Sequence, residues 1–353
     1  MHLVSILTPP AEGVSTGLSL GQACSYGLVA ACCLLVRFPV YATAVLGPVL
    51  LLGLLGLGIA HGACDQLVWP AYRPVRGPRW AYQVRFGLGY LGLAGAVGLV
   101  WWQWPGVAAA LFFALTAWHW GSADAPAHPQ RGAWLAHSLL RGALLFALPA
   151  YFWPAETVRH VNGLLLLTGA QPTLPSAWSG LTVGLLGGVL AGHLGLWAYF
   201  AWQRLPARWL RDAGEALLLA GLFSSCPPLL ALGVYFVFWH SLQHILRLAP
   251  LLGYAAGPAR ARTRLIFFAR RALPMLAASL ALLAGAYVLG SNWLPAQNAW
   301  LGLVVLAASV VTVPHALLVT LVMDAPKWQA RPSTTSSKQL LNSSKDYKEH
   351  TPS

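Results

Sequence analysis

Four apolar stretches of this chain carry histidine side chains, and three of the stretches place an aspartate or a second histidine close by. The segments are His61-Gly-Ala-Cys-Asp65, His119-Trp-Gly-Ser-Ala-Asp124, His240-Ser-Leu-Gln-His244 and Pro314-His315. Ionisable groups within apolar segments are costly, so they indicate function. Imidazole is a ligand of zinc, copper, iron and nickel. The recurrence of one residue type in separate segments therefore predicts a metal site built mainly from histidine.

His61, His119, His240 and His244 are the predicted ligands of this site. His240 and His244 are spaced i, i+4 and so share one face of a helix. Helices packed in a bundle can point such residues from separate segments at one centre. For His315 three interpretations stay open: a fifth ligand, a residue that gates the substrate, or a structural histidine.

Two aspartates follow the first two predicted ligands. Asp65 lies one turn beyond His61, and Asp124 lies five residues beyond His119. A metal-bound histidine usually donates its second N–H group to a carboxylate or a carbonyl. Asp65 and Asp124 are candidates for that role, and the alternative is that they only mark the membrane boundary.

The composition indicates which kind of molecule must position these side chains. Of the 353 residues, 9 % are charged and 57 % are hydrophobic, and the mean hydropathy is +0.61. A soluble domain carries about 25 % charged residues, so this class is excluded. The net charge of +13 does not indicate a nucleic-acid partner, because the basic residues lie in short loops between apolar segments. The composition predicts an all-α, polytopic transmembrane helix bundle that has the lipid bilayer as a partner.

About 20 apolar residues are needed for each crossing of the bilayer, which predicts about ten spans (eight to ten). The predicted spans are 16–36, 40–62, 86–103, 105–122, 133–153, 177–202, 212–224, 228–246, 272–290 and 299–323. Residues 212–246 form either one broken helix or two, because Pro227 and Pro228 interrupt them. The apolar stretch 160–170 is too short to cross and is expected to be interfacial or re-entrant. Residues 1–324 are expected to form one transmembrane domain, and 325–353 a disordered polar cytoplasmic tail.

The charged residues of the loops predict how the spans are oriented in the membrane. With ten crossings and a cytoplasmic N-terminus, 19 of the 22 Lys and Arg residues face the cytoplasm. Only Arg37 and Arg159 face the other side, and Arg141 falls within a span. This asymmetry follows the positive-inside rule and predicts that both termini are cytoplasmic.

Other ionisable residues receive structural interpretations. His193, in the middle of a span with no acid nearby in sequence, is expected to be structural, and His137 and His160 are expected to lie at the membrane interface. Glu215 follows Arg211 and Asp212 near the start of a span. It is expected either to pair with a histidine or an arginine or to lie at the helix N-terminus, where negative charge is favourable, and the second position is the favoured one.

These segments together resemble a known family. Gly58-Ile-Ala-His61-Gly-Ala-Cys-Asp65, His119-Trp-Gly-Ser-Ala-Asp124, Tyr235-Phe-Val-Phe-Trp-His240-Ser-Leu-Gln-His244 and Pro314-His315 resemble the Brp/Blh family of microbial membrane-bound β-carotene 15,15′-dioxygenases. The resemblance covers roughly residues 50–325. Cys64 stands where the family often has leucine, a departure that is expected to alter packing and not chemistry.

The resemblance implies a single Fe(2+) ion held by His61, His119, His240 and His244. It further implies cleavage of β-carotene by O2 at the central 15,15′ double bond, with two molecules of all-trans-retinal as products. A multi-pass protein of the cell inner (plasma) membrane, with a retinal-binding rhodopsin as a possible acceptor of the product, is the corresponding expectation.

One alternative uses the same residues differently. A membrane transporter or proton-relay protein would also place histidine and aspartate inside the bilayer, but it would string them across the full thickness. In the predicted topology the histidine motifs concentrate in one half of the bilayer, which favours the oxygenase.

Overall fold

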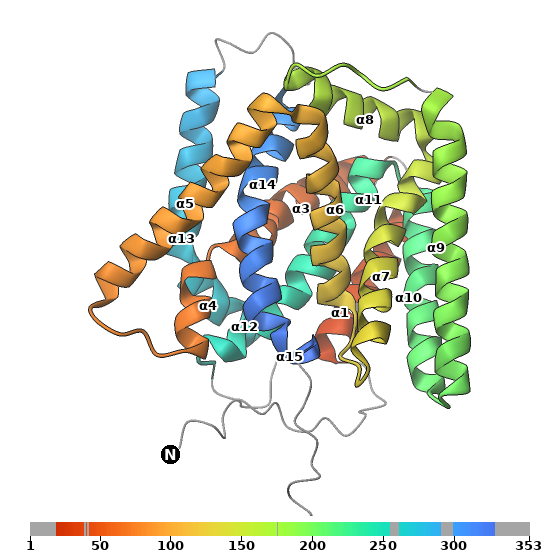
Figure 1. Cartoon of the computed structure of the whole chain (residues 1–353), viewed down its shortest axis with the longest axis horizontal. Coiled ribbons are helices and arrows are strands. Elements are labelled where there is room, and N and C mark those ends of the chain that lie inside the picture. The colour runs from red at the N-terminus through yellow and green to blue at the C-terminus, as the bar shows by residue number, and fades with distance from the viewer. Residues whose placement is uncertain are drawn as a thin grey trace, which may run out of the picture.

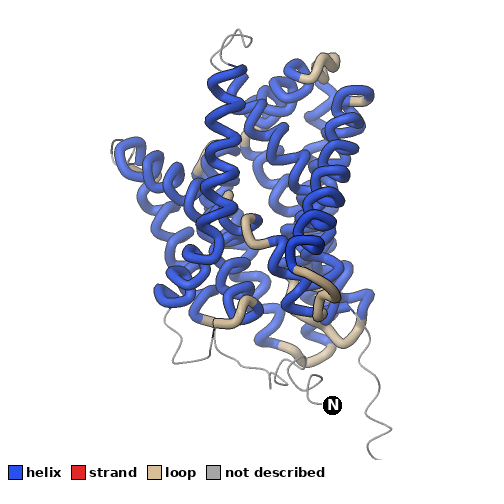
Figure 2. Tube along the Cα trace, turned by 90° about the vertical axis from the view of Figure 1, so that its left-hand side faces the viewer, coloured by secondary structure: helices blue, strands red, loops and turns tan. Residues whose placement is uncertain are grey.

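The computed structural model describes residues 19–38, 40, 42–174, 176–254, 261–290 and 299–328 of the chain. Within these residues every regular element is a helix, so the expected all-α class is confirmed (Figure 2). The elements are Leu20–Leu35 (α1), Ala42–Leu46 (η1), Gly47–Gly53 (α3), Leu54–Gly58 (η2), Ala60–Gly62 (η3), Asp65–Tyr72 (α4), Arg79–Gln103 (α5), Pro105–Asp124 (α6), Arg131–Phe152 (α7), Pro154–Leu167 (α8), Ser176–Trp202 (α9), Pro206–Ser225 (α10), Pro228–Val234 (α11), Tyr235–Ser241 (η4), Leu242–Leu251 (α12), Ala261–Gly290 (α13), Ala299–Leu318 (α14), Val319–Met323 (η5) and Ala325–Trp328 (α15).

Seven helices of the described residues are long and apolar enough to cross a membrane. They are Ala44–Tyr72, Arg79–Gln103, Arg131–Phe152, Trp178–Trp202, Pro228–Leu251, Ala261–Gly285 and Val304–Met323. These lengths and compositions are those of a multi-pass membrane protein. The count of ten crossings and the cytoplasmic termini stay predictions, and most of the expected tail, 329–353, lies outside the described residues.

Burial separates central from peripheral helices. In the apolar part of Pro228–Leu251, 67 % of the residues are buried, against 11 % in Arg79–Gln103 and in Ala261–Gly285. Figure 1 shows α5 and α13 at one side of the molecule, and α9 and α10 at the other. The continuous segment α11–η4–α12 therefore lies in the core, and the two outer helices present apolar side chains to their surroundings.

The helices α6 and α7 approach each other unusually closely. A Cβ atom on Gly121 would lie 1.9 Å from the Ser138 carbonyl oxygen, and one on Gly142 would lie 1.9 Å from the Ala117 carbonyl oxygen. Only glycine fits at these two positions, and small residues commonly permit such contact between membrane helices. The contact fixes the position of α6, which carries His119.

The predicted interruption of 212–246 is observed as two separate helices. The helix α10 ends at Ser225, Cys226 is extended, and α11 begins at Pro228. Proline at the first helical position lacks the N–H group that a helix interior would need, so the break at Pro227-Pro228 has a local cause. The stretch 160–170 belongs mostly to α8, a helix of 14 residues that runs across one end of the molecule (Figure 1).

Candidate metal centre

Five buried histidines converge from five elements. They are His61 in η3, His119 in α6, His240 in η4, His244 in α12 and His315 in α14. Each is at most 8 % exposed. The ring centroids of neighbouring pairs are 4.8 to 6.2 Å apart. The structure thus gathers the rings of all four residues predicted as ligands and of His315, although the candidate ligand atoms that all lie within 4.8 Å of one another come from His61, His119 and His315, and not from His240 or His244.

Irregular helix geometry surrounds several of these histidines. His240 lies within the π-helix η4, and the π-helix η2 ends three residues before His61. A π-turn inserts an extra residue and rotates the following side chains relative to an α-helix, and such turns occur frequently at functional sites. The direction in which His240 and His61 point therefore depends on backbone geometry that a regular helix would not supply.

The hydrogen bonds of the cluster leave ring nitrogens free inside the protein. Both ring nitrogens of His119, His240 and His244 are buried and have no hydrogen-bond partner among the described residues. Buried polar groups are normally paired. One such nitrogen is not diagnostic, because Nε2 of His193 is also unpaired while its Nδ1 donates to the Val189 carbonyl at 2.9 Å. His193 lies against Trp197, outside the cluster, whereas the cluster concentrates several free nitrogens at one place.

Two members of the cluster have a defined tautomer. Nδ1 of His61 donates to the Gly58 carbonyl, and Nδ1 of His315 donates to the Asp65 carboxylate at 2.9 and 3.0 Å. In a neutral imidazole the remaining nitrogen, Nε2, then carries the lone pair. The Asp65 carboxylate also accepts a hydrogen bond of 3.1 Å from the Tyr90 hydroxyl. Asp65 therefore contacts a cluster histidine, but that histidine is His315 and not His61, which it follows in the sequence.

This arrangement fits a first-row transition metal. One candidate ligand atom from each of His61, His119 and His315 lies within 4.8 Å of the other two. Neutral imidazole nitrogen suits zinc, copper, iron and nickel. Metal-bound histidine usually donates its other N–H group to a carboxylate or a carbonyl, as His61 and His315 do here. A bound ion would give the unpaired nitrogens of His119, His240 and His244 a partner. It would also explain why the rings of His61 and His315 are oriented by hydrogen bonds at Nδ1.

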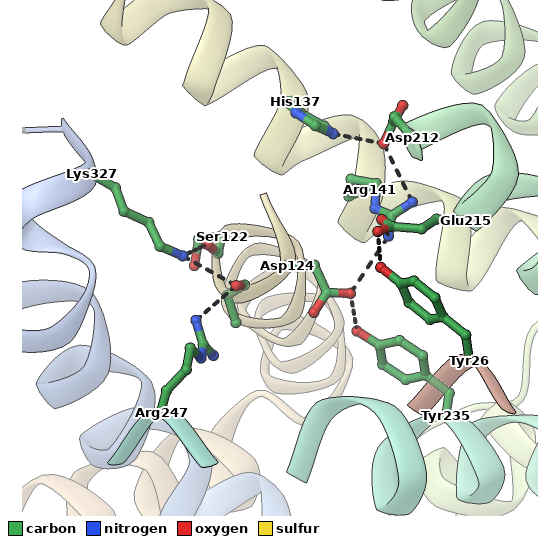
Figure 3. A network of polar contacts seen from close by, with 11 residues as sticks. Tyr26, Ser122, Asp124, His137, Arg141, Asp212, Glu215, Tyr235, Arg247 and Lys327 are labelled. Atoms are coloured by element: carbon green, nitrogen blue, oxygen red, sulfur yellow. Dashed lines mark hydrogen bonds and ion pairs between the residues drawn. The ribbon is translucent and has the colours of Figure 1, made fainter. Parts of the chain in front are cut away.

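The other predicted aspartate lies in a separate polar network. Asp124 accepts a hydrogen bond of 2.9 Å from the Tyr235 hydroxyl and lies 4.0 Å from the Arg141 guanidinium (Figure 3). Arg141 is 1 % exposed and also lies 2.6 Å from Glu215 and 3.4 Å from Asp212. Buried charges are stable only when they are paired and hydrogen-bonded.

Further hydrogen bonds complete this Arg141 network. The Tyr26 hydroxyl donates to Glu215, the Trp197 indole donates to Asp212 at 2.6 Å, and Nε2 of His137 lies 2.7 Å from Asp212. The network joins α1, α6, α7, α9, α10 and η4 through charge-assisted contacts.

Two favoured expectations about this region were wrong. Glu215 lies in the middle of α10, which begins at Pro206, so the N-terminal position is wrong and the alternative, a pair with an arginine, is observed with Arg141. His137 is 5 % exposed and contacts Asp212, so it is not interfacial. Arg141 within a predicted span was the signal that a buried counter-charge was required, but the sequence alone does not pair it with α10.

Basic side chains satisfy the carbonyl groups at the end of α6. Lys327 donates to the Ser122 and Ala123 carbonyls at 2.7 and 3.1 Å, and Arg247 donates to the Ala123 carbonyl at 2.9 Å (Figure 3). Positive charge is favourable at a helix C-terminus. Burial lowers the pKa of the Lys327 ammonium group, and the nearby Asp324 carboxylate counteracts part of that shift. These contacts hold the turn of α6 that follows His119.

An apolar groove lies beside the histidine cluster. It has a volume of about 300 Å³ and runs between α5 on one side and α14 and η5 on the other. Its lining includes Gly89, Tyr90, Leu93, Pro314 and Leu317. Tyr90 bonds to Asp65, and Pro314 precedes His315 in the chain, so the groove wall adjoins the cluster.

Comparison with known proteins places the chain among carotenoid-cleaving proteins. A family model described as "Beta-carotene 15,15'-dioxygenase" matches residues 52–323, which include all five cluster histidines. A Halobacterium salinarum protein named "Probable beta-carotene 15,15'-dioxygenase Blh" is 32 % identical over 284 residues, or 74 % of this chain and 80 % of that protein.

A second relative comes from the uncultured marine bacterium 66A03. It is named "Beta-carotene 15,15'-dioxygenase" and is 25 % identical over 264 residues, or 74 % of this chain and 89 % of that protein. No solved structure matches the chain. The extent of the family match, together with the relative from Halobacterium, shows that the chain belongs to the β-carotene 15,15′-dioxygenase family.

Proposed function

We propose that this protein cleaves β-carotene at its central 15,15′ double bond and gives two molecules of all-trans-retinal. In this reaction O2 supplies both oxygen atoms, the carbon–carbon double bond breaks, and each carbon receives one oxygen as an aldehyde. The observation that carries the proposal is the convergence of buried histidines within the region that matches the family.

The proposed cofactor is Fe(2+), held by His61, His119, His240 and His244. When bound, the ion would supply the redox chemistry that activates O2. Phe236 packs against His61 and His240, with ring centroids 5.4 and 6.0 Å apart, and Trp120 lies 5.8 Å from His240. These rings exclude water from the site, which protects a reactive centre from side reactions.

The substrate is a hydrocarbon without ionisable groups, so its recognition depends on apolar surface. It dissolves in the bilayer, and the groove lined by Gly89, Leu93 and Leu317 offers such a surface next to the cluster. In this proposal one half of the carotenoid lies along the groove while the central double bond lies at the histidines. The proposed location is the cell inner membrane, with a retinal-binding rhodopsin as a product acceptor.

Expression in a bacterium that accumulates β-carotene tests the proposal. The wild-type protein should bleach the orange colour and produce retinal, and His240→Ala should do neither while remaining in the membrane fraction. His193→Ala is the matched control, because His193 is a buried histidine outside the cluster. Equal retinal formation by His240→Ala and wild type would contradict the ligand assignment.

The transporter or proton-relay alternative has one observation in its favour, which is the buried Arg141 network. Such a protein would move a solute or protons without consuming carotenoid. Unchanged β-carotene in the expressing cells, together with proton uptake by vesicles that contain the purified protein, would favour the alternative.

A further inference from the structure

We propose that His315 is a fifth imidazole ligand of the metal site and that Asp65, held by Tyr90, positions it. The inference rests on the proposed function, since it concerns the same metal ion. It goes beyond the four-histidine site because it gives a metal-binding role to His315 and a positioning role to Asp65, which lies 250 positions away in the chain.

The position of His315 is the first argument. Its ring centroid lies 4.8 Å from that of His61, 5.0 Å from that of His119 and 5.6 Å from that of His244. Four of the six pairs within the predicted set are 4.9 to 6.2 Å apart. His315 is therefore as close to the set as its members are to one another.

The distances between ligand atoms strengthen this argument. His315 belongs to the set of three residues whose candidate ligand atoms all lie within 4.8 Å of one another. Two nitrogens that share one ion are each about 2.0–2.1 Å from it. A small inward movement of the rings would bring these three nitrogens onto a common ion.

The hydrogen bonds of His315 are the second argument. Nδ1 donates to both oxygens of Asp65, and Asp65 also accepts from the Tyr90 hydroxyl. This leaves the lone pair on Nε2, which is buried and has no hydrogen-bond partner in the described part of the chain. A carboxylate behind an imidazole is the arrangement that orients ligating histidines and raises their basicity.

The two other interpretations of His315 explain less. A structural histidine can also leave one buried nitrogen unpaired, as His193 does, but that role does not explain why a ring nitrogen of His315 lies within 4.8 Å of candidate ligand atoms of His61 and His119. A gating residue would be expected at an accessible position, but His315 is 6 % exposed and Asp65 is 3 % exposed. A ligand role accounts for the burial, the free Nε2 and the contact with Asp65 together.

Metal binding to the purified full-length protein tests the proposal. We would measure the dissociation constant for Fe(2+) by competition with a chromogenic chelator, and the visible absorption of the Co(2+)-substituted protein, which reports coordination number. The variants are His315→Ala and Asp65→Asn, with His193→Ala as the matched control. Asp65→Asn removes the charge and nearly preserves the shape, so it serves even if His315→Ala does not fold.

The expected result is a weaker metal site in both variants. Asp65→Asn should weaken Fe(2+) binding about 10–100-fold, and His315→Ala should weaken it at least as much. The Co(2+) spectrum of His315→Ala should change towards a lower coordination number, and added imidazole should reverse the change. His193→Ala should match the wild type in both measurements.

The outcomes separate this inference from the proposed function. If the wild type binds Fe(2+) and both variants retain its affinity and its Co(2+) spectrum, His315 is not a ligand, while the four-histidine site stands. If the purified wild type binds no metal ion in either measurement, both proposals are wrong.

Discussion

At the scale of single residues, the protein buries two kinds of polar cluster that follow opposite rules. In the Arg141 network, opposite charges and hydrogen bonds compensate one another within the chain. In the histidine cluster, neutral rings converge and leave nitrogens unpaired. Burial of an unpaired polar group costs about 1–3 kcal/mol, and the proposed metal ion would offset this cost for the nitrogens of the second cluster. We therefore infer that the Arg141 network stabilises the fold and that the histidine cluster binds the proposed metal ion.

We expect Arg141→Met to destabilise the protein by about 3–5 kcal/mol, because it leaves buried carboxylates without a counter-charge. The free energy of unfolding in mixed detergent micelles is the measurement. Arg159→Met is the control, since the Arg159 side chain is 69 % exposed and forms a surface pair with Glu156 that is worth about 0–1 kcal/mol.

A double variant makes this prediction specific to charge. Adding Glu215→Gln to Arg141→Met should recover part of the lost stability, because it removes the nearest uncompensated carboxylate. Simple addition of the two destabilising effects would show that packing, not charge, explains the loss.

At the scale of helices, the site depends on deviations from regular geometry. The π-helix η4 orients His240, and the close approach of Gly121 and Gly142 fixes α6 against α7. The π-helix departs from regular helix geometry, whereas the glycine contact brings two regular α-helices close together.

Gly121→Ala tests the contact between α6 and α7. Its Cβ would lie 1.9 Å from a backbone oxygen and 2.7 Å from the Gly142 nitrogen, so the helices must separate. We expect a loss of about 1–3 kcal/mol in the free energy of unfolding and reduced retinal formation, because His119 moves with α6.

Gly106→Ala is the control on the same helix, where an added Cβ has no neighbour within 4 Å among the described residues. It should be neutral or stabilising by up to about 1 kcal/mol. Equal stability of the Gly121→Ala and Gly106→Ala proteins would contradict the packing argument.

At the scale of the whole molecule, the helices leave an apolar groove between the outer surface of the bundle and the histidine cluster. The outer helix α5 packs against α14, which carries His315, and the groove follows this junction. Leu317 and Leu321 on the groove wall are 49 % and 54 % exposed, so the groove is open towards the surroundings of the bundle. A lipid-soluble substrate could therefore approach from the side, without entering water.

Gly89→Phe should obstruct this approach. Gly89 lines the groove and is exposed, and no atom of the described residues lies within 4 Å of its added Cβ, so a side chain at this position can begin without a clash. We expect kcat/KM for β-carotene to fall about tenfold or more, with unchanged iron content. Gly95→Phe, on an exposed part of α5 outside the groove lining, should retain wild-type kinetics. Equal losses in the two variants would argue against the groove as the route.

The sequence by itself determined the membrane class, the all-helical fold and the family. These properties depend on composition, apolar segment length and local motifs, all of which are readable along the chain. It also identified the histidines that converge, because ionisable groups are rare in apolar segments and each therefore carries information.

Only the tertiary structure decided which side chains meet. Asp65 contacts His315 instead of His61, Asp124 belongs to the Arg141 network, and Glu215 pairs with a residue 74 positions away. Such pairings depend on how helices rotate and on where π-turns shift their faces, and no local pattern records either. The physical reason is that a helix presents its side chains around its whole circumference, and only packing against its neighbours selects the face that points to the centre.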